Sequence, residues 1–315
     1  MDAEMYDLLR TSLERVLNET GTEPLAERLA RLGWNEVLAD DATGALALLF
    51  TVKGELAAGA DALSSSLSAW LSHTMGDASL TDATVALDGI DGPSRWTGDG
   101  KLAVSAVATG IPTQSVVVSV DRALAVLPAD AVDARTTHGV DVGQPLTHLT
   151  GTVASAEVRL LEGIDSEAMH CLARRLLCHE LVGLAHHVVA SAVTYTGARI
   201  QYGKPIGTFQ ALQHRIAAAH TLVVGAAGLV AEADRTQDPW ISLVAKAMAG
   251  QAAELACTQA QQCYGAIGFT AEHEFHRYLK RMYALDWLAG DWRSTERRIG
   301  AALQASGQVP RIGSL

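Results

Sequence analysis

Five long stretches of helical periodicity fill the second half of the chain, and they restrict the fold more than any other feature of the sequence. After Asp165, apolar residues recur every three or four positions, as on one face of a helix. Short turns separate the stretches, so successive helices should pack antiparallel as a bundle. The expected helices cover residues 169–196, 209–233, 240–262, 272–288 and 291–305.

Two other patterns precede this bundle. Residues 1–75 predict helices, one of them over 46–60, and the first apolar stripe contains Tyr6, Leu8, Leu9, Leu13, Val16 and Leu17. From about residue 80 to 161 the period shortens towards two, with strands expected at 84–87, 102–108, 115–120 and 153–160. We therefore expect an α+β, mainly α chain: a reduced N-terminal helical domain (1–78), a middle β-barrel-like domain (79–163) and a C-terminal antiparallel helical bundle (164–315). The tail, 307–315, is expected to be frayed.

Charge and composition exclude several classes of function. The 315 residues carry a formal charge of -11, which disfavours a nucleic-acid partner or an anionic membrane surface. The longest apolar stretch, 216–231, is shorter than the ~20 residues of a membrane span, and the first residues do not resemble a secretory signal. We therefore expect a cytoplasmic protein without a membrane segment. Buried, reduced thiols rather than disulfides or a metal site are expected for Cys171, Cys178, Cys257 and Cys263.

Residues 199–213, RIQYGKPIGTFQALQ, combine groups that suit a nucleotide. Arg199 offers a planar fork of donors for a phosphate, Pro205 fixes φ, and Gly203 and Gly207 allow a tight turn or a close approach of the backbone. An ordinary helix–helix connection with a capping glycine is the simpler interpretation of this local chemistry taken alone.

The order of these residues resembles a family motif. Arg-x-x-(Phe/Tyr)-Gly-x-x-(Ile/Leu)-x-x-Phe-Gln joins the first two bundle helices of acyl-CoA dehydrogenases, and residues 262–272, QCYGAIGFTAE, are similar to the second signature of that family. The resemblance covers roughly residues 80–305, and the N-terminal part fits only loosely. It implies the same order of domains and an FAD cofactor.

In that family the two signatures reach across a dimer interface to the ADP half of the neighbour's FAD. By resemblance, Arg199 meets the pyrophosphate, Tyr202 and Ile206 meet the adenosine, and Gln262 and Gly265 close over the same region. One departure is that Ala266 stands at the second position of the family's Gly-Gly pair. The implied cofactor-binding residues are Arg199, Tyr202, Gly203, Ile206, Gln262, Gly265 and Ala266.

By the same resemblance, the chain lacks the groups with which family members hold and use the flavin ring of their own FAD. The strand that carries a flavin-covering aromatic residue in the family has Ala103 at that position, and the family's two positions for the catalytic Glu hold Ala173 and Ala289. We therefore expect no catalytic residue in this chain. A metal site is not expected either, because the sequence from His273 to His276 is one residue short of HExxH and suits a solvated first helical turn.

This resemblance predicts one subunit of a heteromeric, FAD-dependent acyl-CoA dehydrogenase that is inactive alone. A second, longer dehydrogenase-like chain would carry the Glu and share the FAD in an α2β2 assembly, as in actinobacterial steroid degradation, with the CoA thioester of a sterol side chain as a candidate substrate. One alternative is a self-sufficient homo-oligomeric flavoprotein or oxidase with a displaced base, for which Glu180 is the candidate. Glu180 lies two helical turns, about 10 Å, from Ala173. Another alternative is a non-catalytic scaffold that binds no FAD.

Overall fold

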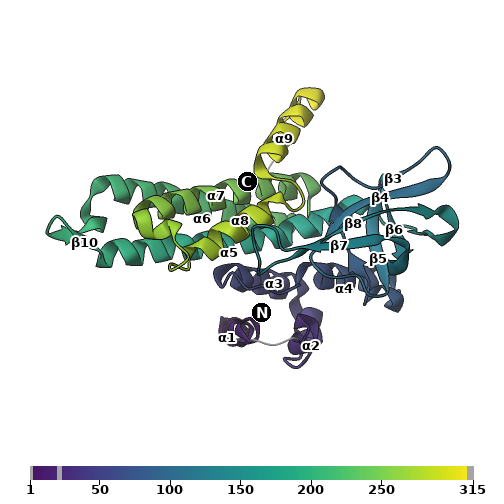
Figure 1. Ribbon diagram of the computed structural model, residues 1–315, viewed down its shortest axis with the longest axis horizontal. Coiled ribbons are helices and arrows are strands. Elements are labelled where there is room, and N and C mark those ends of the chain that lie inside the picture. Colours follow the sequence, from purple (N-terminus) through teal and green to yellow (C-terminus); the bar gives the residue numbers. More distant parts are fainter. Residues whose placement is uncertain (1–2, 20–22, 311–315) are drawn as a thin grey trace. The chain divides into compact units, whose positions relative to one another are not determined.

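The boundary between the two structural units of the chain falls after Ala173, within helix α5 (Ser166–Ala198), which is labelled in Figure 1. The computed structural model describes residues 3–19 and 23–310. One unit comprises residues 1–21, 32–58 and 174–315, and the other comprises 22–31 and 59–173. The second unit contains the strands between residues 84 and 161, and the first contains most of the helices together with a short hairpin at 200–205.

The strand-rich unit is built from two sheets that share one apolar core. The strand order is β1-β5-β6-β9 in one sheet and β2-β4-β8-β7 in the other, with β3 also paired to β4. Alternating residues of β4 and β5, among them Leu102, Val104, Val116 and Val118, point into the core. The strands are β1 (Thr84–Val85), β2 (Leu87–Asp88), β3 (Arg95–Trp96), β4 (Lys101–Ala108), β5 (Ser115–Val120), β6 (Ala123–Pro128), β7 (Asp133–Thr137), β8 (Leu146–Ala154) and β9 (Arg159–Leu161).

The structure confirms the strands expected at 102–108 and 115–120 and corrects the one expected at 153–160. There, β8 ends at Ala154, a 3₁₀ turn covers Ser155–Glu157, and β9 begins at Arg159. Strand β6 was not predicted, because Ala123–Pro128 is an apolar run without alternation. Four of its residues are buried.

Helices α2 (Leu25–Ala30) and α4 (Leu63–Met75) belong to the strand-rich unit as well. Helix α4 packs against β1, and the hydroxyl of Ser64 accepts a hydrogen bond of 2.9 Å from the backbone N–H of Val85. This bond satisfies a backbone donor at the edge of the sheet.

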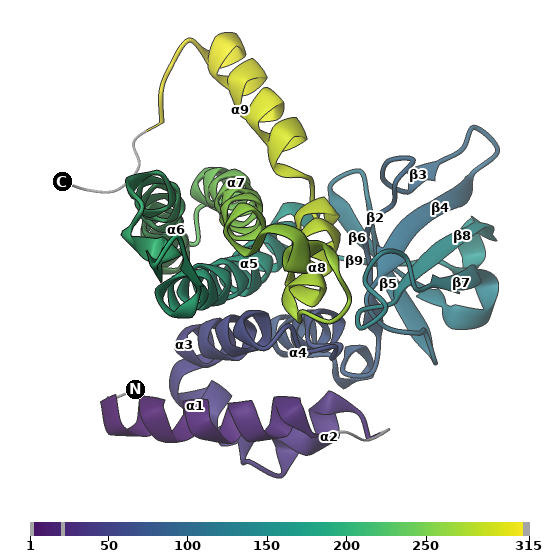
Figure 2. The same cartoon turned by 60° about the vertical axis from the view of Figure 1, so that its left-hand side comes forward.

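The helical unit confirms all five helices expected after Asp165 (Figure 2). Asp238 accepts a hydrogen bond from the Ile241 N–H ahead of Pro239, and Asp291 accepts one from Ser294, so aspartate caps begin two of these helices. Besides α5, the helices are α6 (Gln210–Thr236), α7 (Pro239–Tyr264), α8 (Phe275–Trp287) and α9 (Trp292–Ser306). The expected fraying after Gly307 falls partly on 311–315, outside the described residues.

An amphipathic stripe explains the packing of α6 on α7. The buried residues of α6 recur at intervals of three and four and are mostly small, which allows a close approach of the two helices. They are Ala219, Val223, Ala226, Val230 and Ala233. The opposite face of α6 is exposed.

Two N-terminal helices, α1 (Ala3–Asn18) and α3 (Trp34–Glu55), also belong to the helical unit. Helix α3 touches α5 closely, because a Cβ at Gly54 would lie 2.0 Å from the Glu180 carbonyl and a Cβ at Gly183 would lie 2.2 Å from that of Thr51. The helix expected over 46–60 ends at Glu55, and Ala57 adopts a positive φ of 45°.

Two of the described helices, α5 and α6, are long and apolar enough to cross a membrane by length and composition alone. The apolar window of α5 is 61% buried, as in a core helix, whereas that of α6 is 28% buried. Helix α6 therefore exposes apolar surface that the described residues of its own chain do not cover.

Candidate functional site

A β-hairpin joins α5 to α6 and carries the first predicted motif. Strands β10 (Ile200–Gln201) and β11 (Lys204–Pro205) pair antiparallel through Tyr202 and Gly203. Both turn residues have positive φ, 53° and 77°, as a two-residue type I′ turn requires. Glycine at the second position therefore lets this turn form with little strain.

The hairpin displays its functional groups away from its own core. Tyr202 is 92% exposed, Ile200 is 61% exposed, and Arg199 is exposed at the base of the hairpin. On the inner side, the Phe209 ring lies edge-on to Tyr202 at 6.1 Å, and the Lys204 ammonium lies 4.4 Å from the Phe209 ring centre. A guanidinium and an aromatic ring are thus presented together on a short, ordered loop.

The second motif lies at the end of α7 and packs near the first. The Tyr264 ring contacts Tyr195, four residues before Arg199, at 5.1 Å, and its hydroxyl is 3.0 Å from that of Ser191. Gln262 and Ala266 are exposed, and Gly265 ends α7 with a φ of 63° and open space around it. The chain therefore brings both motifs to the hairpin end of the helical unit. Ile206 follows the hairpin and is half-buried.

The outer face of β4 has no flat ring at the position where the resemblance requires one. Ala103 lies between Arg95 of β3 and Thr152 of β8. Ser105, which shares this face, packs its hydroxyl against Gly89, where an added Cβ would lie 2.4 Å from the oxygen. Ser105 is thus an ordinary strand serine.

The two positions at which the resemblance places a catalytic Glu hold Ala173 and Ala289, in different settings. Ala173 is fully buried inside α5. Ala289 lies in the turn between α8 and α9 with a φ of 58°, followed by Gly290 at 98°. Two consecutive left-handed residues make this a sharp turn, and the alanine carries some backbone strain.

A buried lysine holds that turn in place. The fully buried Lys246 ammonium donates to the backbone carbonyls of Asp286 and Gly290, at 2.8 and 2.9 Å, and lies 3.6 Å from the Asp286 carboxylate. Burial lowers the pKa of Lys246 and raises the pKa of Asp286, although their mutual attraction opposes both shifts. Lys246 therefore fixes the geometry of the Ala289 segment.

Glu180 is locked in a buried ion cluster. Its Oε1 atom lies 2.6 Å from the Lys53 ammonium and 3.3 Å from the Arg281 guanidinium. Arg281 also donates to the carbonyl of Ala58 at 2.6 Å, and Glu180 is 1% exposed. A carboxylate held this way cannot swing out to take a proton from a bound substrate.

These two charged clusters were not predicted from the sequence, although the sequence contains a signal for each of them. Lys53 and Lys246 each interrupt an apolar helical run, and a lone lysine in such a run is buried only when it has partners. His179 belongs to a third charged cluster. Its Nε2 atom lies 2.6 Å from the Asp234 carboxylate, which also contacts Arg175. The histidine thus serves a contact within the chain.

No metal cluster occurs among residues 3–19 and 23–310. His273 lies just before α8, where its ring accepts a hydrogen bond of 3.1 Å from the Phe275 N–H, and its carbonyl lies 2.8 Å from the His276 ring. His187 stacks on Tyr278 at 4.4 Å, and burial lowers its pKa. These histidines have structural contacts rather than a ligand geometry.

Sequence comparisons connect the helical unit to a family of known proteins. Residues 167–304 match the family described as acyl-CoA dehydrogenase, C-terminal domain. The chain is 33% identical to acyl-CoA dehydrogenase FadE34 of Mycobacterium tuberculosis over 243 residues, which is 73% of this chain and 33% of FadE34. It is 35% identical to acyl-CoA dehydrogenase IpdE2 of the same organism over 124 residues, 39% of each protein. The matched regions thus span well under half of these relatives.

Structural comparisons extend the likeness to almost the whole chain. A variant of the steroid ACAD Tcur3481-Tcur3483 has a TM-score of 0.78 at 19% identity, covering 96% of this chain and 99% of the other. The ChsE4-ChsE5 complex from Mycobacterium tuberculosis has a TM-score of 0.76 at 20% identity, covering 99% of each. At these identities the likeness establishes the fold.

Proposed function

We propose that this chain, whose residues 167–304 match the acyl-CoA dehydrogenase C-terminal domain, is the nucleotide-binding subunit of a heteromeric, FAD-dependent acyl-CoA dehydrogenase. The observation that carries the proposal is an asymmetry within the chain. The hairpin presents Arg199 and Tyr202 outward, while Ala103, Ala173 and Ala289 stand where a flavin platform and a base are needed. The proposed partner is a second, longer dehydrogenase-like chain in an α2β2 assembly.

The residues fit the ADP half of FAD but not its flavin half. The Arg199 guanidinium suits a pyrophosphate, the exposed Tyr202 ring suits stacking on adenine, and the open space around Gly265 admits a ligand close to the backbone. The outer face of β4 offers a methyl group where a ring would have to lie. We therefore assign the flavin ring to a surface of the partner.

In this arrangement each chain has a distinct role in the oxidation of an acyl-CoA. When bound, FAD would supply the hydride acceptor for the β-carbon of the thioester. Arg199 and Tyr202 hold and orient the ADP half, and Gln262 at the end of α7 closes over the same region. A Glu of the partner removes the α-proton, a task for which this chain has no free carboxylate at either expected position.

The self-sufficient alternative needs a base within the chain. Glu180 was the only candidate, and its buried ion pairs with Lys53 and Arg281 leave it unable to reach a substrate. A scaffold that binds no FAD would not require an ordered turn that exposes a guanidinium beside an aromatic ring. The names of two neighbours, the ChsE4-ChsE5 complex and the steroid ACAD Tcur3481-Tcur3483, favour a heteromer and a steroid-derived acyl group, and we propose a cytoplasmic location for this complex.

Co-expression tests the proposal directly. The full chain is purified alone and after co-expression with each longer dehydrogenase-like chain of the same organism, and each sample is assayed for flavin absorbance and acyl-CoA oxidation. We expect a colourless, inactive chain alone and a yellow, active complex. A chain that is yellow and active alone would support the self-sufficient enzyme, and a colourless, inactive complex would support the scaffold.

A further inference from the structure

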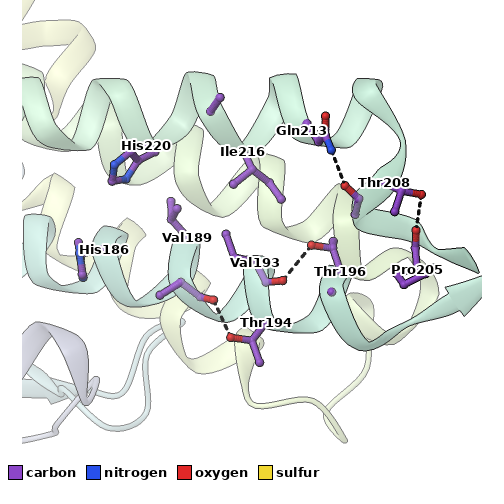
Figure 3. A pocket seen from close by; sticks show the side chains of 14 residues that line it. His186, Val189, Val193, Thr194, Thr196, Pro205, Thr208, Gln213, Ile216 and His220 are labelled. Atoms are coloured by element: carbon purple, nitrogen blue, oxygen red, sulfur yellow. Dashed lines mark hydrogen bonds between the residues drawn. The ribbon is translucent and has the colours of Figure 1, made fainter.

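The hairpin between α5 and α6 is held in place by backbone hydrogen bonds. The Ile206 N–H donates to the Arg199 carbonyl at 2.8 Å, and the Arg199 N–H donates to the Tyr195 carbonyl at 2.9 Å. Beyond the hairpin, the Gln213 side chain of α6 donates to the carbonyl of Gly207 at 2.9 Å (Figure 3). The hairpin is therefore fixed to the ends of both helices, and the position of Arg199 follows the position of α5.

The second motif folds around the side chain of Tyr264. Helix α7 ends at this residue, and a 3₁₀ turn over Gly265–Phe269 follows. Gly268 of this turn is buried against the tyrosine, because an added Cβ would lie 3.0 Å from the Tyr264 Cβ atom. The Tyr264 ring also contacts the ring of Phe275 in α8, with centroids 5.2 Å apart. Tyr264 is 4% exposed, so it is the packing centre of the second motif.

The same side chain contacts helix α5 just before the first motif. The Tyr264 hydroxyl donates a hydrogen bond of 3.0 Å to the Ser191 hydroxyl, and its ring meets the Tyr195 ring edge-on at 5.1 Å. Ser191 and Tyr195 share one face of α5 because they are four residues apart, and Arg199 follows directly after the helix. Burial raises the pKa of Tyr264, so its phenol stays protonated and can donate. Tyr264 thus connects the helix that ends before Arg199 to the turn of the second motif.

A ligand that is held by two separate motifs requires a fixed distance between them. Binding groups have to be placed within about 0.5 Å of the productive geometry, and residues behind them supply this precision. On this basis, and resting on the proposed function, we propose that Tyr264 is a positioning residue for FAD. Its hydrogen bond to Ser191 sets the distance between Arg199 and Gln262 at which both hold the ADP half. Because Tyr264 is buried, it acts through these exposed residues.

A double-mutant cycle between Tyr264 and Arg199 tests this proposal. The chain is co-expressed with each longer dehydrogenase-like chain of the same organism, and the complex is stripped of flavin and titrated with FAD. Y264F removes the hydroxyl and keeps the ring, so it should raise the dissociation constant for FAD about fivefold. In the R199A background the same substitution should change this constant less than about twofold, because the group that it positions is absent.

Ser191 provides the reciprocal test. S191A should weaken FAD binding as much as Y264F does, and the double variant S191A/Y264F should bind no more weakly than either, because all three lose the same hydrogen bond. S191T keeps a hydroxyl and should bind FAD within about twofold of the parent. The matched control is Y283F, which removes the hydroxyl of a tyrosine that is 53% exposed on α8 and should leave FAD binding unchanged. Thermal unfolding of each variant establishes that it is folded at the temperature of the titration.

The outcomes separate this proposal from the proposed function. If R199A weakens FAD binding while Y264F binds FAD as tightly as the parent, Tyr264 is an ordinary core residue and the proposed function stands. Equal losses from Y264F in the parent and in the R199A background would also overturn the proposal, because the hydroxyl would not act through Arg199. If the parent complex binds no FAD, the proposed function fails and this proposal fails with it.

Discussion

The Lys53 ammonium lies 2.6 Å from the Glu180 carboxylate, and both side chains are almost completely buried. Arg281 contacts the same carboxylate oxygen from α8, so one acidic group ties together α3, α5 and α8 of the helical unit. This cluster gives Glu180, two helical turns from Ala173, a place in the packing of three helices.

Replacing Glu180 should destabilise the protein without removing a catalytic group. E180Q leaves two buried cations without their counter-charge, which should lower the free energy of unfolding by about 3 kcal/mol. Denaturant unfolding measures this loss, and turnover per folded complex should stay within about twofold of the parent. The double variant K53M/E180Q should recover part of the lost free energy of unfolding, because it removes one of the two buried cations that contact Glu180. A stable E180Q protein with abolished turnover and retained FAD would make Glu180 the base after all.

Lys246 should be equally important for the turn that contains Ala289. K246M keeps the length of the side chain but removes both hydrogen bonds to the carbonyls of Asp286 and Gly290. It also leaves Asp286 buried without its cation, so we expect a loss of about 3 kcal/mol in the free energy of unfolding. Hydrogen exchange should show faster opening of residues 286–292 than of α7. Unchanged exchange in this segment would show that the lysine does not hold the turn.

The positive φ values of the hairpin predict that one substitution strains the turn and another preserves it. G203A forces an alanine to a φ of 77° in open space, at a cost of about 1 kcal/mol from the backbone alone. It should weaken FAD binding by the complex several-fold while leaving thermal unfolding nearly unchanged. Y202N creates the Asn-Gly pair that type I′ turns favour, so it preserves the turn while removing the ring. Weaker FAD binding by Y202N would therefore measure the contribution of the aromatic ring. Binding equal to that of the parent would show that Tyr202 is not part of the site.

Burial should keep the native thiols unreactive over a wide pH range. Desolvation raises the pKa of Cys178 to about 12 and also raises the pKa of Cys257 and Cys263. Because the thiolate is the reactive form and these groups stay protonated, alkylation of the native chain should stay slow and nearly flat from pH 7 to pH 9. All four thiols should react after unfolding. Rapid labelling that rises tenfold per pH unit in the native chain would indicate an exposed thiol.

The sequence predicted long helices and the positions of both motifs well, because each rests on local pattern. The helix from Ser166 to Ala198 follows from its apolar period, and the tight turn follows from Gly203, which tolerates a positive φ. The short strands were harder, since β6 is uniformly apolar and β8 and β9 are divided by a 3₁₀ turn. The partners of Lys53 and Lys246 lie far away in the sequence, so no local pattern could identify them.

The most direct measurement of the central claim is the affinity of the assembled complex for FAD when Arg199 is replaced. Because the guanidinium is proposed to meet the pyrophosphate, R199A should raise the dissociation constant for FAD by about 10- to 100-fold, with R199K intermediate. R215A, which removes a nearby cation that donates to Gln259, should stay within about twofold of the parent. If R199A forms an intact complex that binds FAD as tightly as the parent, the hairpin does not hold the nucleotide and the account is contradicted.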